Sequence, residues 1–114
     1  MKKVVFHVDE MEKWPMALSN IRNMLRGYQE SATACQIELL ANGAAVRAYA
    51  DNAGENQSAM QALADAGVLF AACNNALRAA FIEPQALFAF VTVVPVGVIE
   101  LAERQLAGYA YIKP

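Results

Sequence analysis

Residues 68–75 read VLFAACNN, an uninterrupted apolar run that ends in a cysteine and two asparagines. Such a run is typical of a strand that is covered on both faces, as the inner strands of a parallel sheet are. Residues 76–82 have a helical pattern, and Asn74 or Asn75 can cap the first turn. The stretch therefore predicts a strand followed directly by a helix, which is the repeating unit of an α/β fold.

The same alternation of strand and helix patterns continues in both directions along the chain. It predicts βα units and a mainly parallel, five-stranded sheet with helices on both faces. We therefore predict a single α/β domain over residues 1–114. The predicted strands are 3–8, 35–41, 68–72, 90–94 and 109–112. The first predicted helix begins at Pro15, and three more cover 56–66, 76–82 and 97–107. A short helical turn is predicted within 44–53.

Two glycines mark predicted helix ends. Gly67 and Gly108 follow helical patterns at the position where a left-handed residue commonly ends a helix. In the last predicted helix, Glu100 and Arg104 have the spacing of an i,i+4 ion pair. The apolar residues expected to face the sheet from this helix are Val98, Leu101, Ala102 and Leu106.

The composition excludes several classes of protein. Nine basic and eleven acidic side chains give a net charge of −2, and 57% of the 114 residues are apolar. The small negative charge argues against nonspecific nucleic-acid binding, and the apolar content argues against disorder. The longest uncharged stretch, 84–99, is broken by Pro95 and Gly97, whereas a membrane-spanning helix needs about 20 apolar residues. We expect a soluble, cytoplasmic protein with reduced thiols.

The sequence also argues against the usual ligands of α/β domains. Two cysteines and one histidine are too few for a structural zinc site. Asp9, Glu10 and Glu12 follow the first predicted strand, and their carboxylates would repel the phosphates of FMN, a dinucleotide or a P-loop nucleotide. A magnesium-dependent phospho-acceptor domain would need an Asp and a Lys where this chain has Cys73 and Pro95. We expect no metal and no organic cofactor.

Cys73 is the strongest candidate for chemistry, because it lies where a buried strand ends and a helix begins. Free N–H groups in the first helical turn would stabilise its thiolate, the form that attacks sulfur electrophiles. Asn74 and Asn75 are expected to cap this helix and to support the thiolate. The alternative is that Cys73 is a small apolar residue packed in a tight corner.

His7 is a second candidate. It lies at the end of the first predicted strand, and if that strand is central, His7 comes close to Cys73 and can donate or accept a proton there. The alternative is a histidine held in structural hydrogen bonds. Cys35 begins a strand with no helix after it and is interpreted as core, so Cys73 is expected to be alkylated faster than Cys35.

Four segments resemble the DsrE/DsrF-like family: VVFHVDE (4–10), NIRN (20–23), GVLFAACNNALRA (67–79) and GVIELAERQLAGYAYIKP (97–114). The most specific is the cysteine followed by a polar pair and Leu77, although Ala76 stands where relatives tend to have Thr. The resemblance implies a three-layer, flavodoxin-like fold that often assembles as trimers or hexamers. It also implies a place in sulfur relay, in which Cys73 accepts sulfane sulfur as a persulfide and passes it to a small sulfur-carrier protein.

Two functions from different classes follow. The first is a sulfur carrier or sulfurtransferase-like protein, which needs a reactive, accessible Cys73. The alternative is a non-catalytic binding or regulatory module with a ligand pocket at the carboxyl ends of the strands and a buried, unreactive Cys73.

A homo-oligomer is expected separately, because aromatic residues are enriched in interfaces and small residues allow close approach of backbones. The alternative is that these aromatic residues complete the core of the monomer. The candidates for the interface are Trp14, Phe81, Tyr109, Tyr111 and Ile112.

Overall fold

Five strands form one sheet in which every neighbouring pair is parallel, as the computed structural model of residues 1–114 shows. The strand order is β4-β3-β2-β1-β5, so β2 is the central strand. The strands are β1 (Lys2–Val8), β2 (Cys35–Ala41), β3 (Leu69–Cys73), β4 (Val91–Val94) and β5 (Ala110–Ile112). The predicted α/β fold with a five-stranded parallel sheet is confirmed.

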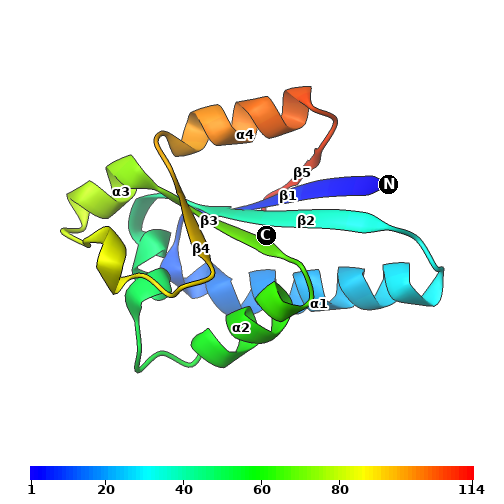
Figure 1. Cartoon of the computed structure of the whole chain (residues 1–114), viewed down its shortest axis with the longest axis horizontal. Helices are drawn as coiled ribbons and strands as arrows, with labels where there is room; N and C mark the ends of the chain where they lie inside the picture. The colour runs from blue at the N-terminus through cyan, green and yellow to red at the C-terminus, as the bar shows by residue number, and fades with distance from the viewer.

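Helices cover both faces of this sheet (Figure 1). Two of them, α1 and α2, lie on one face, and α4 alone lies on the other as the chain crosses from β4 at one edge to β5 at the opposite edge. The α-helices are α1 (Trp14–Glu30), α2 (Gln57–Asp65), α3 (Asn74–Ala79) and α4 (Gly97–Leu106), and the 3-10 segments are η1 (Met11–Lys13), η2 (Gly43–Ala50) and η3 (Pro84–Ala86). No helix is both long and apolar enough to span a membrane.

The larger core lies between the sheet and α1. Trp14, expected at an interface, is fully buried here, and its indole N–H donates to the carbonyl oxygen of Ala45 at 3.0 Å. Tyr49 packs edge-on against Trp14 and against Phe70 of β3. Burying side chains of this size contributes roughly 1.5–3 kcal/mol each. This core has 21 buried residues and the core on the other face has 5, so this face supplies most of the hydrophobic stabilisation.

The smaller core lies under α4, and it changes the expected orientation of that helix. Among the four residues predicted to face the sheet, only Leu101 is buried. The side that faces the sheet also carries Gly97 and Arg104, because a buried carboxylate on β2, Glu38, lies beneath α4. An apolar stripe is therefore left on the outer surface of α4, made of Val98, Ile99, Ala102 and Leu106.

All four α-helices end in the same way. In each, a residue with a positive φ follows the C-cap, and the next residue donates its N–H to the carbonyl oxygen five residues before it, as Tyr109 does to Arg104. Glycine occupies this left-handed position after α2 and α4, as predicted from Gly67 and Gly108. Ala32 and Phe81 occupy it after α1 and α3, at φ values of 52° and 57°.

Candidate functional site

Cys73 is the last residue of β3 and the N-cap residue of α3. Alternation along β3 places its side chain on the α4 side of the sheet, next to the smaller core. The backbone N–H of Gly97, the first residue of α4, donates a hydrogen bond to Cys73 Sγ at 3.3 Å. The sulfur therefore faces the amino-terminal end of a ten-residue helix, where N–H groups and the helix dipole favour negative charge.

Gly97 is required at this contact for reasons of space. A Cβ atom at position 97 would lie 2.9 Å from Cys73 Cβ and 3.3 Å from Cys73 Sγ. It would also lie 3.3 Å from a methyl carbon of Leu40. The absence of a side chain at Gly97 is what lets its N–H reach the sulfur.

The close fit also buries the thiol. Cys73 is only 6% exposed, whereas Cys35 is half-buried at the start of β2, the opposite end of the sheet. Both cysteines are free. Accessibility therefore opposes the expectation that Cys73 is alkylated before Cys35.

Asn74 and Asn75 do not have the capping role predicted for them. They are the first two residues of α3, Cys73 holds the N-cap position, and no side chain makes a cap hydrogen bond. The prediction was wrong because the helix begins at once after β3, two residues earlier than its apolar pattern indicates. Support of the thiolate by either asparagine stays a prediction.

His7 lies on the same sheet face as Cys73, but β2 separates their strands. Two strand spacings amount to about 10 Å, so the expectation that a central β1 brings His7 close to Cys73 does not hold. His7 Nε2 donates to Asn42 Oδ1 at 2.8 Å, and Tyr111 O–H donates to His7 Nδ1 at 2.7 Å. Both ring nitrogens are engaged, and proton exchange with Cys73 stays a prediction without a supporting contact.

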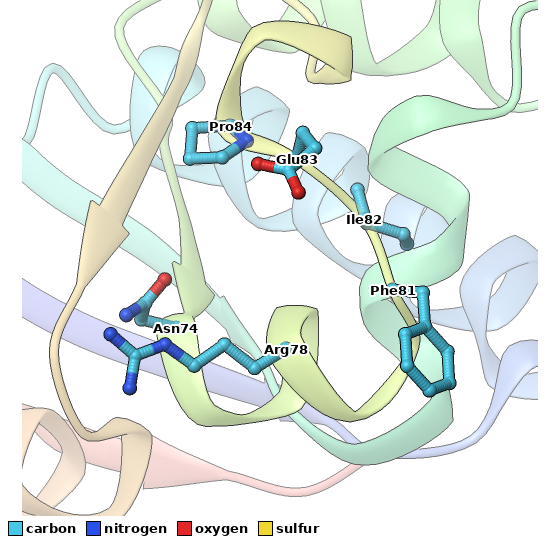
Figure 2. Close-up of a pocket in the computed structure, with 6 residues that line it drawn as sticks. All are labelled: Asn74, Arg78, Phe81, Ile82, Glu83 and Pro84. Carbon is cyan, nitrogen blue, oxygen red and sulfur yellow. The ribbon is translucent and has the colours of Figure 1, made fainter.

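A pocket of about 480 Å³ lies beside the start of α3 (Figure 2). We call it the α3 pocket. Asn74 and Arg78, one helical turn apart, form one end, and Figure 2 shows the Glu83 carboxylate turned into the pocket from the other side. The α3 pocket is lined by Asn74, Arg78, Phe81, Ile82, Glu83 and Pro84.

A buried carboxyl cluster lies under α4, away from the thiol. Glu38 is 1% exposed, and its Oε1 lies 3.0 Å from Arg104 Nε without hydrogen-bond geometry, because that N–H is donated to Glu100 Oε2 at 2.9 Å. Burial, together with the nearby Glu100 carboxylate, raises the pKa of Glu38 to about 8. This shift favours the protonated form of Glu38, whose O–H can donate to Glu100.

No group of three or more His, Cys, Asp or Glu side chains is placed to hold a metal ion. The sequence analysis did not identify Gly97, Tyr111, Arg78 or Glu83 as site residues. A signal existed for Gly97, because the segment after a predicted strand, Pro95-Val96-Gly97, lies at the same sheet edge as Cys73 once the strands are parallel. Tyr111 gave no such signal, since its contact with His7 depends on the strand order.

The family model described as the DsrE/DsrF-like family matches residues 29–114. The structure is similar to MTH1491, a protein of unknown function from Methanobacterium thermoautotrophicum, with a TM-score of 0.90 and 32% identity over 100% of both chains. It also resembles BT1422, a conserved protein of unknown function from Bacteroides thetaiotaomicron, with a TM-score of 0.77 and 16% identity over 99% of this chain and 95% of that one. No curated protein matches the sequence.

Proposed function

The chain belongs to the DsrE/DsrF-like family, and from this premise we propose that it takes part in sulfur relay with Cys73 as the persulfide carrier. The observation that carries the proposal is the hydrogen bond from Gly97 N–H to Cys73 Sγ. A backbone N–H at a helix start favours a negatively charged sulfur over a neutral one. Of the two thiols, only Cys73 has such a donor.

The transfer step needs no cofactor. Cys73 Sγ attacks the terminal sulfur of a donor R–S–SH, and the bond between the two donor sulfurs breaks. R–S⁻ leaves and takes up the proton that Cys73 has lost. The products are Cys73–S–SH and R–SH, so atoms, charge and oxidation state balance. The thiolate of an acceptor then attacks the outer sulfur of Cys73–S–SH, which moves that sulfur to the acceptor and restores the Cys73 thiol.

Because Cys73 is buried, a sulfur donor must first gain access to its sulfur atom. At 6% exposure, the sulfur has no room for an attached outer sulfur beside Gly97 unless the start of α4 shifts. The start of α4 follows β4 after only Pro95 and Val96, so it is this short segment that must move to expose the thiol. We propose that such opening precedes loading.

A second candidate is favoured by the same burial. A binding or regulatory module would keep Cys73 closed and unreactive and would use the α3 pocket for a ligand. Family membership favours the sulfur relay, and the reactivity of Cys73 decides between the two.

The assembly is also a proposal. The apolar stripe on α4 and the 40% exposed Tyr111 suit contacts between copies of the chain, in a trimer or hexamer. Tyr109, expected at an interface, is buried under α4 and completes the monomer's own core. A cytoplasmic location would keep the thiols reduced, and a small sulfur-carrier protein is the proposed acceptor.

The test is intact-protein mass spectrometry after incubation with a persulfide donor. We expect the wild type and Cys35→Ser to gain one sulfur atom and Cys73→Ser to gain none. Circular dichroism establishes that both variants are folded. Persulfide that survives Cys73→Ser would place the carrier elsewhere, and a wild type that gains no sulfur from any donor would favour the binding module.

A further inference from the structure

The α3 pocket has a size and a charge pattern that the fold itself does not require. About 480 Å³ is within the range of small-molecule sites and suits an amino acid or a short peptide. Neither Arg78 nor Glu83 takes part in an ion pair, although both line the pocket. The cation and the carboxylate are therefore free to bind charged groups of a ligand.

The polar ends of the pocket are arranged for a zwitterion. The Arg78 guanidinium and the Asn74 carboxamide lie beside each other at one end, where both can donate hydrogen bonds to a carboxylate (Figure 2). Glu83 can accept from an ammonium group at the other end. Ile82 and Pro84 add apolar surface to the lining.

Phe81 supports a ligand role. Its backbone φ of 57° is one that residues other than glycine rarely adopt, and its ring is 93% exposed. A glycine would end α3 without strain, as Gly67 and Gly108 end α2 and α4. No packing within the chain accounts for the aromatic ring, whereas strained residues of this kind often line ligand sites.

We propose that the α3 pocket binds the sulfur donor itself, a zwitterionic low-molecular-weight hydropersulfide made from an amino acid or short peptide. The inference rests on the proposed function of Cys73. Asn74 lines the pocket and directly follows Cys73 in the chain, so the thiol belongs to the residue next to the pocket lining. The pocket holds the charged part of R–S–SH, the terminal sulfur passes to Cys73 as described above, and R–SH leaves.

The experiment measures the rate of Cys73 persulfidation in a Cys35→Ser background with three donors. These are glutathione hydropersulfide, the uncharged hydropersulfide of N-acetylcysteamine, and inorganic polysulfide. We expect saturation with the glutathione donor alone, and Arg78→Gln should raise its half-saturating concentration about tenfold. Glu83→Gln should act in the same direction, and Arg26→Gln, which changes an exposed arginine on α1, is the matched control.

The outcomes separate the two proposals. If Cys73 is loaded but Arg78→Gln behaves like Arg26→Gln, or the uncharged donor is as fast as glutathione hydropersulfide, the pocket is not the donor site and the sulfur relay stands. If no donor loads Cys73, the proposed function fails. Titration with S-methylglutathione, followed by amide NMR shifts, then decides the pocket. Shifts at Phe81 and Arg78 that Arg78→Gln abolishes would retain the pocket as a site for zwitterionic peptides of this kind, and unchanged spectra would overturn it.

Discussion

Gly97 donates its backbone N–H to Cys73 Sγ at 3.3 Å, which ties the first residue of α4 to the last residue of β3. Two features produce this contact. The pairing of β3 with β4 places Val94 opposite Cys73, and the two-residue connection after Val94 brings α4 directly over the sulfur. The N–H that can stabilise a charged sulfur is thus also part of the segment that covers it.

The Gly97→Ala variant tests that contact. The added Cβ would lie 2.9 Å from Cys73 Cβ, so α4 must shift, and we expect the free energy of unfolding to fall by about 1–3 kcal/mol. Persulfide loading should also change, because the hydrogen bond to Sγ is displaced. Gly27→Ala is the control, because Gly27 lies in α1 and a Cβ added there meets no other atom. The free energy of unfolding of this variant, measured with urea, should rise by roughly 0.5–1 kcal/mol. Equal effects at the two positions would contradict the close fit.

The sequence predicts where the strands and helices lie along the chain better than it predicts which strands lie side by side in the sheet. Apolar runs such as 68–73 mark the strands, because a strand covered on both faces must be apolar throughout. The order of the strands depends on long-range packing, which periodicity does not report. The assumption of a central β1 therefore misplaced His7 relative to Cys73.

The site was predictable only in part, for similar reasons. Cys73 follows from a local pattern, a strand end before a helix. The orientation of α4 does not, because the buried Glu38 on β2 turns Arg104 toward the sheet and leaves an apolar stripe outside. Phe81 carries no helix-ending signal, since the left-handed position is usually glycine.

Phe81→Gly should stabilise the protein. It removes the strain of a left-handed phenylalanine without losing a packed side chain, so we expect a gain of about 1–2 kcal/mol in the free energy of unfolding. Ala32→Gly, in the same conformation after α1, should give a similar gain, and Phe81→Ala should give none because the strain remains. Thermal and urea unfolding measure all three. A destabilised Phe81→Gly would mean that the ring is packed in solution.

The apolar stripe on α4 predicts self-association. Leu106 is 81% exposed at the last turn of the helix, where a lysine is electrostatically favourable, so Leu106→Lys should leave the fold intact and lower the solution mass. Light scattering at micromolar concentration measures this mass. Met16→Lys, at an exposed position on α1, is the control and should keep the mass of the wild type. A wild type with the mass of one 12.3 kDa chain would remove the prediction.

Glu38 gives the protein a predictable dependence on pH. Its pKa in the folded state is raised to about 8, above the ordinary 4.5, so the folded protein holds a proton that the unfolded chain releases. The stabilisation from this proton is fully present below about pH 4.5 and is lost as the pH rises through 8. The neighbouring charges on α4 are Glu100 and Arg104. Burial acts to raise the pKa of Glu100, but hydrogen bonds from Glu38 and Arg104 outweigh it and lower that pKa.

Glu38→Gln isolates this effect, because glutamine keeps the shape and a hydrogen-bond donor but cannot ionise. Between pH 5 and 8 the wild type should lose stability relative to Glu38→Gln by up to about 1 kcal/mol per pH unit, so the variant becomes the more stable protein at the alkaline end. Urea unfolding at several pH values measures the difference, in which the other titrating groups largely cancel. Glu103→Gln, an exposed glutamate on the same helix, should run parallel to the wild type. Parallel curves for the wild type and Glu38→Gln would mean that Glu38 is ionised in the folded protein, and that Arg104 compensates its buried charge.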